Sequence, residues 1–322
     1  MKAIANDRYG PPSALELREL PRPEPGPDGI LVRVQAAAIN PADFHILRGS
    51  PLPARLMIGG VRGLRRQVNP VPGVDVAGVV EAVGPEVTAF APGDEVFGMR
   101  NGSLAEYVLG AERNFVPKPE RLTFEQAAAI PVAGITALQG LRDKAELQPG
   151  RRVLITGASG GVGHFAVQIA KALGAEVTGV TRNVELVRSL GADHVIDYTR
   201  EDFTENGTRY DLIFDNVGRW PLAALRRVLT PQGTLIPNGG GIGLRRIVLR
   251  SIAALVLDRV TKQRFVMFMA KLKRDDLLTL KELVDEDKLT PVIDRTYPLA
   301  EAAAALEYLE AEHARGKVIV TP

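Results

Sequence analysis

The segment Arg152–Gly163, which reads RVLITGASGGVG, constrains the fold more than any other part of this chain. It begins with apolar, β-prone residues, as a buried parallel strand requires, and then enters a turn with glycines at 157, 160 and 163. Glycines at this spacing allow a tight turn, let the backbone approach a pyrophosphate, and let the next helix pack closely on the strand. The free amides and positive dipole end of that helix favour an anion.

The residues after this turn complete a βαβ unit. Apolar residues recur at helical spacing from Phe165 to Leu173, Gly174 ends the helix, and Glu176–Val180 reads as a second strand. This context predicts a bound dinucleotide rather than a purely structural turn. The cofactor-binding residues predicted in the turn are Ser159, Gly160, Gly161 and Val162.

The end of the second strand bears on which dinucleotide binds. Enzymes that use NAD usually place Asp or Glu about 20 residues beyond the glycines, to hold the ribose 2′-hydroxyl. This chain has Thr181-Arg182-Asn183 there, and no acid before Glu185. Arg182 can pair with a 2′-phosphate and Thr181 can donate a hydrogen bond to it, so we predict NADPH. The alternative is that Arg182 is simply a solvated loop residue.

Length and composition restrict the class of protein. At 322 residues the chain exceeds one ordinary core, so two domains are expected. A net charge of +2 gives no reason to expect a nucleic acid partner. The absence of cysteine excludes disulfides and suits a reducing cytoplasm. We expect a cytoplasmic protein without an integral membrane segment, because its most apolar long stretch, Ile247–Leu257, is too short to cross a bilayer and is interrupted by Arg250.

The chain has two regions with different sequence patterns. In the first 120 residues, short β-type runs are separated by proline and glycine, which predicts an antiparallel, β-rich domain. From Thr123 onward, strand and helix patterns alternate, as in a doubly wound parallel sheet. The last 50 residues are expected to return to the first domain. We therefore predict an α/β protein with a discontinuous domain of residues 1–123 and 273–322 and an inserted dinucleotide-binding domain of residues 124–272.

Several motifs in this order resemble the medium-chain dehydrogenase/reductase superfamily. They include AAINPADFHILRG, PGVDVAGVVEAVG, AAAIPVAGITAL, TGASGGVG, GADHVIDY and HARGKVIV. Within the superfamily the chain is similar to the zinc-free quinone oxidoreductase branch, of the reticulon-4-interacting-protein type. The resemblance implies a GroES-like catalytic domain, a Rossmann domain, and a cleft between them for NADPH and substrate. It also implies hydride transfer to a quinone or to the double bond of an α,β-unsaturated carbonyl.

The chain departs from the zinc-dependent members of that superfamily. They have cysteine where Asn40 stands and a His-Glu pair where Val74-Asp75 stands. Catalytic zinc needs three protein ligands of sulfur, imidazole or carboxylate type. The four histidines are scattered along the sequence, and one of them, His164, falls inside the cofactor helix. We predict no metal site, and an alcohol dehydrogenase activity would lose its Lewis acid.

The resemblance nominates two catalytic residues, Asn40 and His45. It places Asn40 near the nicotinamide and the acceptor, where its amide would donate to the developing oxyanion. His45 falls where zinc-dependent relatives place a proton-relay histidine, and solvent is the alternative proton source. The alternative for Asn40 is a turn residue before Pro41, and the alternative for His45 is a histidine in a loop without a catalytic role. Asp43 is expected to order that turn.

Further cofactor contacts follow from the resemblance and from the strand ends. Thr136 matches a threonine that lies on the nicotinamide side of the cofactor in the family. The alternative is that its hydroxyl bonds to the backbone of its own helix. Tyr198 matches a position that reaches the 2′-phosphate, or it is a packed aromatic. Lys317 is assigned to a phosphate, or it is a surface lysine. The remaining contacts predicted at the ends of strands are Asn216, Gly239 and Gly240.

Two segments suggest interactions beyond the cofactor. The run Arg264–Ala270 (RFVMFMA) reads as an apolar edge strand, which favours a homodimer paired through that edge. The tetrapeptide GLRR occurs at 63–66 and 243–246, and indicates either a membrane-surface contact or a cover over the cleft. The predicted function is a zinc-independent NADPH reductase of quinones or enones. The alternative is an NADPH-binding sensor or scaffold with little turnover.

Overall fold

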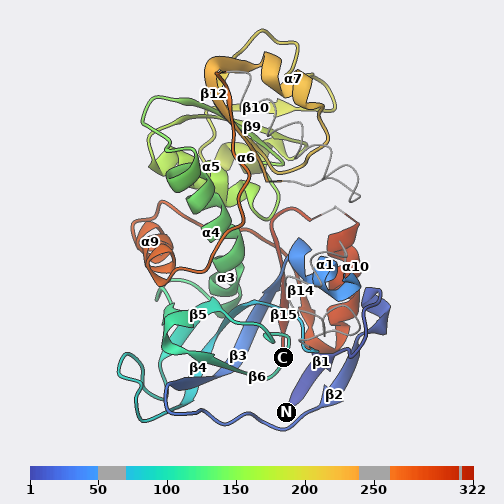
Figure 1. Ribbon diagram of the computed structural model, residues 1–322, viewed down its shortest axis with the longest axis vertical. Helices are drawn as coiled ribbons and strands as arrows, with labels where there is room; N and C mark the ends of the chain where they lie inside the picture. The colour runs from blue at the N-terminus through green and yellow to red at the C-terminus, as the bar shows by residue number, and fades with distance from the viewer. Residues whose placement is uncertain (50–69, 239–261, 312–313) are drawn as a thin grey trace. The chain divides into compact units, whose positions relative to one another are not determined.

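The computed structural model of the protein describes residues 1–49, 70–238, 262–311 and 314–322 (Figure 1). The chain forms two compact units. Unit 1 comprises Met1–Ala133, Leu272–Asp285 and Pro291–Pro322, and unit 2 comprises Gly134–Lys271 and Glu286–Thr290. The limits predicted from the sequence, 123/124 and 272/273, stay a prediction about independently folding domains. Both GLRR segments lie outside the described residues.

Unit 2 is an alternation of strands and helices. Its strands are β8 (Arg152–Thr156), β9 (Glu176–Thr181), β10 (His194–Asp197), β11 (Tyr210–Asp215), β12 (Leu229–Pro237) and β13 (Arg264–Phe265). Its helical elements are the π-helical η3 (Gln139–Lys144), α5 (Gly163–Ala172), α6 (Val184–Ser189) and α7 (Leu222–Arg227). The bounds of β8, α5 and β9 agree closely with the sequence pattern around the glycine turn.

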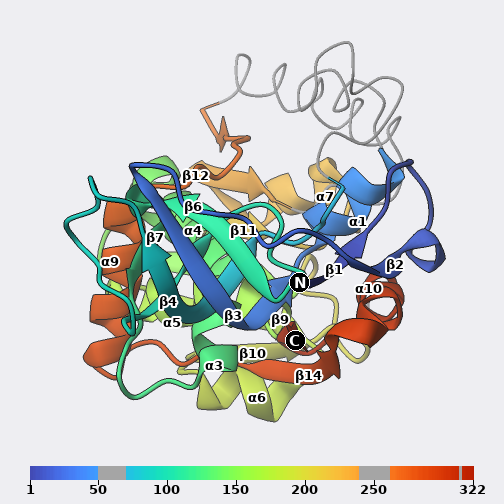
Figure 2. The same cartoon turned by 90° about the horizontal axis from the view of Figure 1, so that it is seen from below.

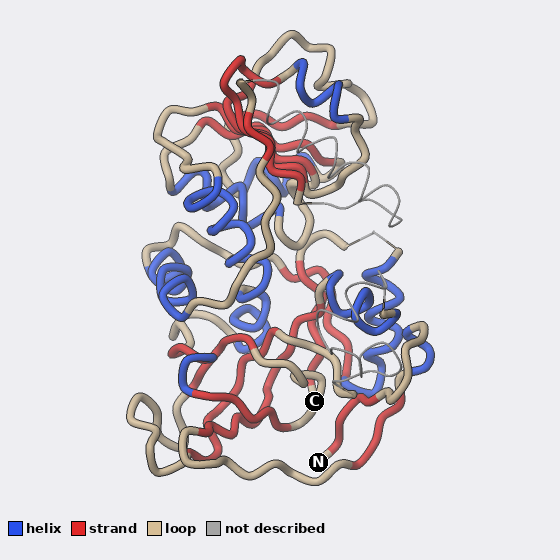
Figure 3. The backbone as a smooth tube through the Cα atoms, viewed as in Figure 1, coloured by secondary structure: helices blue, strands red, loops and turns tan. Residues whose placement is uncertain are grey.

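The strands of unit 2 form one parallel sheet in the order β10-β9-β8-β11-β12-β13, drawn in red in Figure 3. Counted from β8, this is the 3-2-1-4-5-6 order of dinucleotide-binding folds, so the predicted doubly wound sheet is confirmed. Leu154, Ile213, Leu235 and Phe265, from four neighbouring strands, belong to one buried core. Their burial explains the β-branched and apolar runs of these strands.

The edge strand β13 is shorter than predicted. Of the run Arg264–Ala270, only Arg264 and Phe265 pair with β12. The amide of Val266 still donates to the carbonyl of Leu235 at 2.9 Å, but β12 ends at Pro237, which has no N–H to extend the ladder. The prediction of a seven-residue strand was therefore wrong.

Unit 1 holds the β-rich part of the chain. Its strands are β1 (Lys2–Ala5), β2 (Glu16–Glu19), β3 (Gly29–Ile39), β4 (Asp75–Val83), β5 (Glu95–Met99), β6 (Tyr107–Ala111), β7 (Phe115–Pro117), β14 (Ile293–Pro298) and β15 (Lys317–Thr321). Its helical elements are η1 (Pro12–Ala14), α1 (Pro41–Arg48), η2 (Glu112–Asn114), α3 (Phe124–Ala129), α9 (Arg274–Asp285), η4 (Leu299–Glu301) and α10 (Ala302–Glu310). Helix α4 (Pro131–Leu138) crosses the boundary between the units.

The main sheet of unit 1 has the order β14-β15-β3-β4-β5-β7, with β6 also paired to β3. Its pairs are antiparallel as predicted, except that β14 and β15 are parallel. Strands β1 and β2 form a separate antiparallel pair. Helices α1 and α10 lie side by side (Figure 1), and α9 lies against β7 (Figure 2). Strands β14 and β15 near the C-terminus thus belong to the same sheet as β3 and β4.

The segment after β3 is a helix rather than the turn that its NPAD sequence suggested. Pro41 occupies the first helical position of α1, where its missing N–H is not needed. The carboxylate of Asp43 accepts a hydrogen bond from the backbone N–H of Asn40 at 2.7 Å. Gly49 ends the helix with a φ of 59°. Asp43 therefore orders the start of a helix.

Among the described residues, no helix is both long enough and apolar enough to span a lipid bilayer.

Candidate functional site

The carboxyl ends of the strands in unit 2 meet at one edge of the sheet. Register pairs Thr156 of β8 with Val180 of β9 and with Asp215 of β11, and Asp215 with Pro237 of β12. In open parallel sheets, ligands bind outside this edge, at the point where the strand order reverses. That point lies between β8 and β11, so the turn after β8 occupies the expected ligand position.

The glycine turn has the geometry of a phosphate cradle. Gly157 has a φ of +61°, which favours glycine. A Cβ on Gly163 would lie 2.0 Å from the Gly157 carbonyl oxygen, so only glycine lets α5 begin this close to β8. A Cβ on Gly160 would meet just that same oxygen, at 3.2 Å, and its outer side is open to a ligand. The turn therefore fits a pyrophosphate.

Ser159 and Thr181 are joined across the turn. The hydroxyl of Thr181 donates to the Ser159 hydroxyl at 2.8 Å, and Asn183 donates its side-chain amide to the same oxygen at 3.0 Å. Ser159 and Thr181 are buried, whereas Arg182 is exposed. Asn183 was not predicted from the sequence as a site residue, although it directly follows Arg182.

Tyr198 lies at the end of β10, where register pairs Asp197 with Thr181. Its ring packs edge-on against Trp220, with centroids 6.3 Å apart. The ring of Tyr198 is thus packed against another aromatic side chain, as the alternative for this residue stated. The contact of its hydroxyl with a 2′-phosphate stays a prediction. Hydrogen bonds from Thr199, and more weakly the charges of Arg200 and Arg182, lower the pKa of Asp197.

Asn216 belongs to a hydrogen-bond network at the end of β11. Its side-chain nitrogen donates to the Thr156 carbonyl at 3.1 Å, and its oxygen accepts from Asn238 at 2.8 Å. Thr156 in turn donates to the buried carboxylate of Asp215 at 2.7 Å. These bonds hold the strand ends together, and sequence reasoning missed Thr156, Asp215 and Asn238. Gly239 and Gly240 lie outside the described residues.

Unit 1 buries a charged group around Asn40, which we call the Asn40 cluster: Asn40, Asp75 and Lys317. These residues are 4%, 0% and 2% exposed. The Lys317 ammonium donates to the Asn40 Oδ1 at 2.6 Å and to the Asp75 Oδ2 at 3.1 Å. The Asn40 Nδ2 donates to the same Asp75 oxygen at 3.0 Å. The alternative that Lys317 is a surface lysine was wrong.

Strand register brings the Asn40 cluster together. Antiparallel pairing places Val318 of β15 opposite Ile39 of β3, so Lys317 comes next to Asn40. Antiparallel pairing of β3 with β4 places Ala38 opposite Asp75. Three neighbouring strands therefore carry one member each to the same end of the sheet. The other carboxylate oxygen of Asp75 accepts from the Val132 amide at 2.9 Å, in the first turn of α4.

Asp43 is a second buried carboxyl beside this cluster. It is 2% exposed and accepts backbone hydrogen bonds from Asn40 and Gly73. Burial raises the pKa of Asp43 to about 7, with the backbone donors and Lys317 opposing the shift. Burial likewise raises the pKa of Asp75, against the opposing charge of Lys317.

His45 lies on the exposed side of α1, away from the hydrogen bonds of the Asn40 cluster. Its ring is tilted against Phe44, with centroids 4.5 Å apart. Desolvation lowers the pKa of His45, which Glu310 partly offsets, so the imidazole is neutral near pH 7. It belongs to a helix and not to a loop, and its role in proton transfer stays a prediction.

Thr136 lies in α4 and is half-buried, and its contact with a nicotinamide stays a prediction. Across residues 1–49, 70–238, 262–311 and 314–322, no three His, Cys, Asp or Glu side chains gather as metal ligands do. Asn40 and Asp75 bond to each other and to Lys317.

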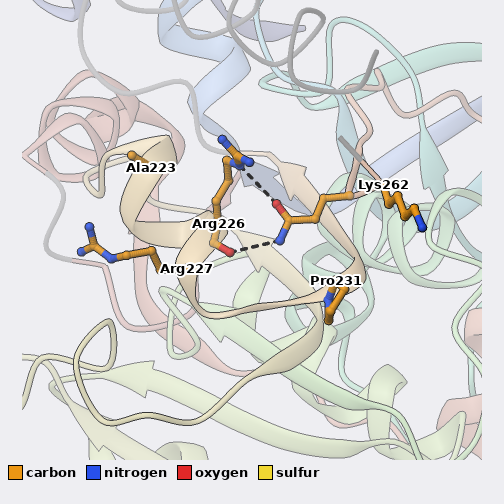
Figure 4. Close-up of a pocket in the computed structure, with 6 residues that line it drawn as sticks. Ala223, Arg226, Arg227, Pro231 and Lys262 are labelled. Carbon is orange, nitrogen blue, oxygen red and sulfur yellow. Dashed lines mark hydrogen bonds between the residues drawn. The ribbon is translucent and has the colours of Figure 1, made fainter. Parts of the chain in front are cut away.

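The surface of unit 2 also carries a pocket of about 490 Å³ (Figure 4). Arg226, Arg227 and Lys262 are among its lining residues, and Figure 4 shows the two hydrogen bonds that tie Arg226 to its neighbour Gln263. Pro231 lies near the start of β12 and Lys262 precedes β13. The pocket is thus at the amino ends of parallel strands, opposite the edge that bears the glycine turn.

Two family models match separate parts of the chain. The model of the alcohol dehydrogenase GroES-like domain matches residues 26–120, and the model described as zinc-binding dehydrogenase matches residues 190–320. The first match lies within unit 1, and the second contains strands of both units.

Curated relatives align with nearly the whole chain. Quinone-oxidoreductase QR1 of Triphysaria versicolor, a chloroplast protein, is 34% identical, over 100% of this chain and 98% of the relative. An NADPH-dependent alkenal/one oxidoreductase from chloroplasts of Arabidopsis thaliana is 34% identical, over 100% and 80%. The mitochondrial NAD(P)H oxidoreductase RTN4IP1 of Mus musculus is 35% identical, over 91% and 82%.

Among solved structures, the quinone oxidoreductase of Escherichia coli complexed with NADPH is similar over 100% of both chains. Its TM-score is 0.83 and its sequence identity is 25%.

Proposed function

Because the chain belongs to the zinc-free quinone oxidoreductase branch of the medium-chain dehydrogenase/reductase superfamily, we propose that it reduces a quinone or the activated double bond of an enone with NADPH. The observation that carries this proposal is the glycine turn after β8. A glycine at 163 is required by the packing, and the outer side of Gly160 is open, as pyrophosphate binding requires.

In this proposal each predicted residue has a physical task. NADPH, when bound, supplies the hydride. Gly160, Gly161 and the start of α5 hold the pyrophosphate, Thr136 orients the nicotinamide, and Asn40 donates an N–H to the acceptor oxygen as it becomes negative. Asn216, Gly239 and Gly240 complete the cofactor contacts proposed from the sequence.

The preference for NADPH over NADH is part of the proposal. Thr181, Arg182 and Tyr198 lie at the ends of two paired strands, where an adenosine 2′-phosphate would sit. Arg182 is exposed, so its guanidinium is accessible to a phosphate. The charges of Arg200 and, more weakly, Arg182 help to lower the pKa of Asp197, and this carboxylate offsets part of the positive charge at the site.

The proton that follows the hydride would come from His45 or from water. His45 is exposed, and its lowered pKa leaves it neutral near pH 7. A neutral imidazole passes a proton on through one ring nitrogen while the other receives one from solvent. Water as the donor requires no side chain at all.

We also propose a cytoplasmic homodimer. Edge strand β13 is followed by Met267 and Met269, which are 50% and 77% exposed, and an apolar edge of this kind is suited to pairing with a second copy. The absence of cysteine suits a reducing compartment. Light scattering that gives only a 34.7 kDa species at micromolar concentration would contradict the dimer.

The test is oxidation of NADPH by the purified protein with a panel of quinones and enones, repeated with NADH. Turnover with NADPH preferred supports the proposal. Tight NADPH binding without turnover on any acceptor contradicts it and favours the alternative, an NADPH-binding sensor or scaffold.

A further inference from the structure

We propose that Lys317 and Asp75 are positioning residues that hold the Asn40 amide in one orientation, so that its second N–H points to the acceptor oxygen. This inference rests on the proposed function, in which Asn40 is the donor. It assigns Lys317 to the acceptor side of the reaction, in place of the phosphate contact suggested by the sequence.

The chemistry of the partners determines the orientation of the amide. Lys317 has donors only, and an ionised Asp75 has acceptors only. With the Asn40 oxygen 2.6 Å from the ammonium and its nitrogen 3.0 Å from the carboxylate, every contact joins a donor to an acceptor. A flipped amide would set donor against donor and acceptor against acceptor. The orientation is therefore enforced by the neighbours.

The hydrogen bonds also leave one donor for a ligand. A side-chain amide has two N–H groups, and within the described part of the chain the Asn40 nitrogen donates one hydrogen bond, to Asp75. Asp75 is in turn anchored by the Val132 amide at 2.9 Å. The second N–H of Asn40 thus has a fixed direction before any ligand arrives, which is how a preorganised donor stabilises developing charge.

Stability alone is a poor reason for these charges. Lys317 and Asp75 are 2% and 0% exposed, and removing two charges from water costs about as much as their attraction returns. A well-packed apolar pair would serve the fold equally well. An apolar pair would not orient the Asn40 amide, and this is the property that the charged pair adds.

The first variant is Lys317→Met, which keeps the length of the side chain and removes its donors. We expect kcat to fall about 10²-fold, as for loss of one oxyanion donor, because the amide is free to flip. The Kd for NADPH and the KM for the acceptor should stay within about twofold, since the binding surfaces are unchanged. Lys317→Arg, which keeps charge and donors, should recover part of kcat.

A double variant guards against a simple folding defect. Lys317→Met alone leaves Asp75 buried without its countercharge, which is destabilising. Lys317→Met with Asp75→Asn removes both charges, so the thermal midpoint should recover relative to the single variant. The new amide at 75 can donate to the Asn40 oxygen and so favours the flipped orientation. We therefore expect restored stability with kcat still low.

Lys118 offers a matched control in the same unit. It is 8% exposed, donates to the carbonyls of Pro119 and Leu122, and pairs with Glu95 at 3.1 Å. Lys118→Met should lower the thermal midpoint, as loss of any buried lysine does, and should leave kcat within about twofold. If Lys317→Met behaves like this control, or the double variant regains full kcat, the positioning role is wrong.

A spectroscopic measurement separates this inference from the proposed function. In protein labelled with ¹⁵N-asparagine, the Asn40 side-chain proton that is hydrogen-bonded to Asp75, assigned by its loss in Asn40→Ser, should lie downfield of its position in a free amide. In Lys317→Met this proton should move toward the free-amide position, and in Lys118→Met it should stay where it is in the wild type. An unchanged Asn40 signal in Lys317→Met overturns the positioning role, even if the wild-type protein turns over no acceptor. Turnover failing while the signal behaves as expected would count against the proposed function alone.

Discussion

The glycine turn of unit 2 and the Asn40 cluster of unit 1 are built in opposite ways. The turn is made by consecutive residues, 157–163, and works through backbone amides and the space that glycine leaves. The cluster is made by side chains of two strands and of the residue that caps α1, and two of its members are 277 residues apart in sequence. The conformation of the turn is determined by steric contacts between neighbouring residues. The assembly of the Asn40 cluster is determined by strand register. Substitutions in the turn should therefore act on cofactor binding, and those in the cluster on the chemical step.

The largest effect that would sharpen this contrast is expected at Gly163. In Gly163→Ala the new Cβ would lie 2.0 Å from the Gly157 carbonyl, so α5 must move away from β8. We expect the thermal midpoint to fall and the NADPH affinity to drop about 10²-fold. Calorimetry and NADPH titration measure both. Gly26→Ala, where nothing lies within 4 Å, is the control and should be neutral.

Gly160 should separate binding from folding. A Cβ there meets only the Gly157 oxygen, at 3.2 Å, so Gly160→Ala should keep the thermal midpoint of the protein without cofactor within a few degrees. The methyl group would occupy the space for the pyrophosphate, and we expect at least tenfold weaker NADPH binding. Normal binding by this variant would mean that the pyrophosphate does not cross Gly160.

Arg182 should affect the choice of cofactor more than its binding. Arg182→Ala removes a pairing partner of the 2′-phosphate, and we expect kcat/KM for NADPH to fall about tenfold while that for NADH changes little. Arg188→Ala, which alters an exposed arginine paired with Glu185, is the control. An equal loss with both cofactors would contradict the assignment of Arg182 to the 2′-phosphate.

The smallest predicted effect is a pH dependence of stability from Asp43. The folded protein keeps this proton up to about pH 7, whereas the unfolded chain releases it near 3.8. Between these values the folded state binds more protons, so the contribution of Asp43 to the free energy of unfolding falls as pH rises and is constant above about pH 7.

Asp43→Asn should therefore show a shallower decline in unfolding free energy than the wild type between about pH 5 and pH 7. Urea denaturation across this range measures it. Asp28→Asn, at an exposed carboxylate, should keep the wild-type slope. Parallel slopes in wild type and Asp43→Asn would show that Asp43 is already ionised at pH 5.

The parts predicted well from the sequence share a local cause. The strand, turn and first helix of unit 2 follow from hydrophobic periodicity and glycine sterics over a dozen neighbouring residues, and the parallel sheet follows from their repetition. The edge strand β13 was overestimated, because its length depends on Pro237 of a different strand. Helix α1 was interpreted as a turn, because Pro41 is compatible with both.

The partners of Lys317 could not be predicted for a different reason. Nothing in the run GKVIV indicates a buried ammonium, because lysine in general is a surface residue. Its burial follows from the pairing of β15 with β3, which no local pattern encodes. The nomination of Asn40 as a catalytic residue stays a prediction, and the resemblance gave no indication that its side-chain amide would be held by Asp75 and Lys317.

The separation of 277 residues between Asn40 and Lys317 also orders events during synthesis. A ribosome delivers Asn40 and Asp75 early, and the residues of β3 and β4 are complete while most of the chain is still to be made. Until β15 arrives, the Asp75 carboxylate has no countercharge, so the partly made sheet must leave that end hydrated. A chain halted before Lys317 would therefore carry Asn40 and Asp75 without the ammonium that both of them contact in the finished protein.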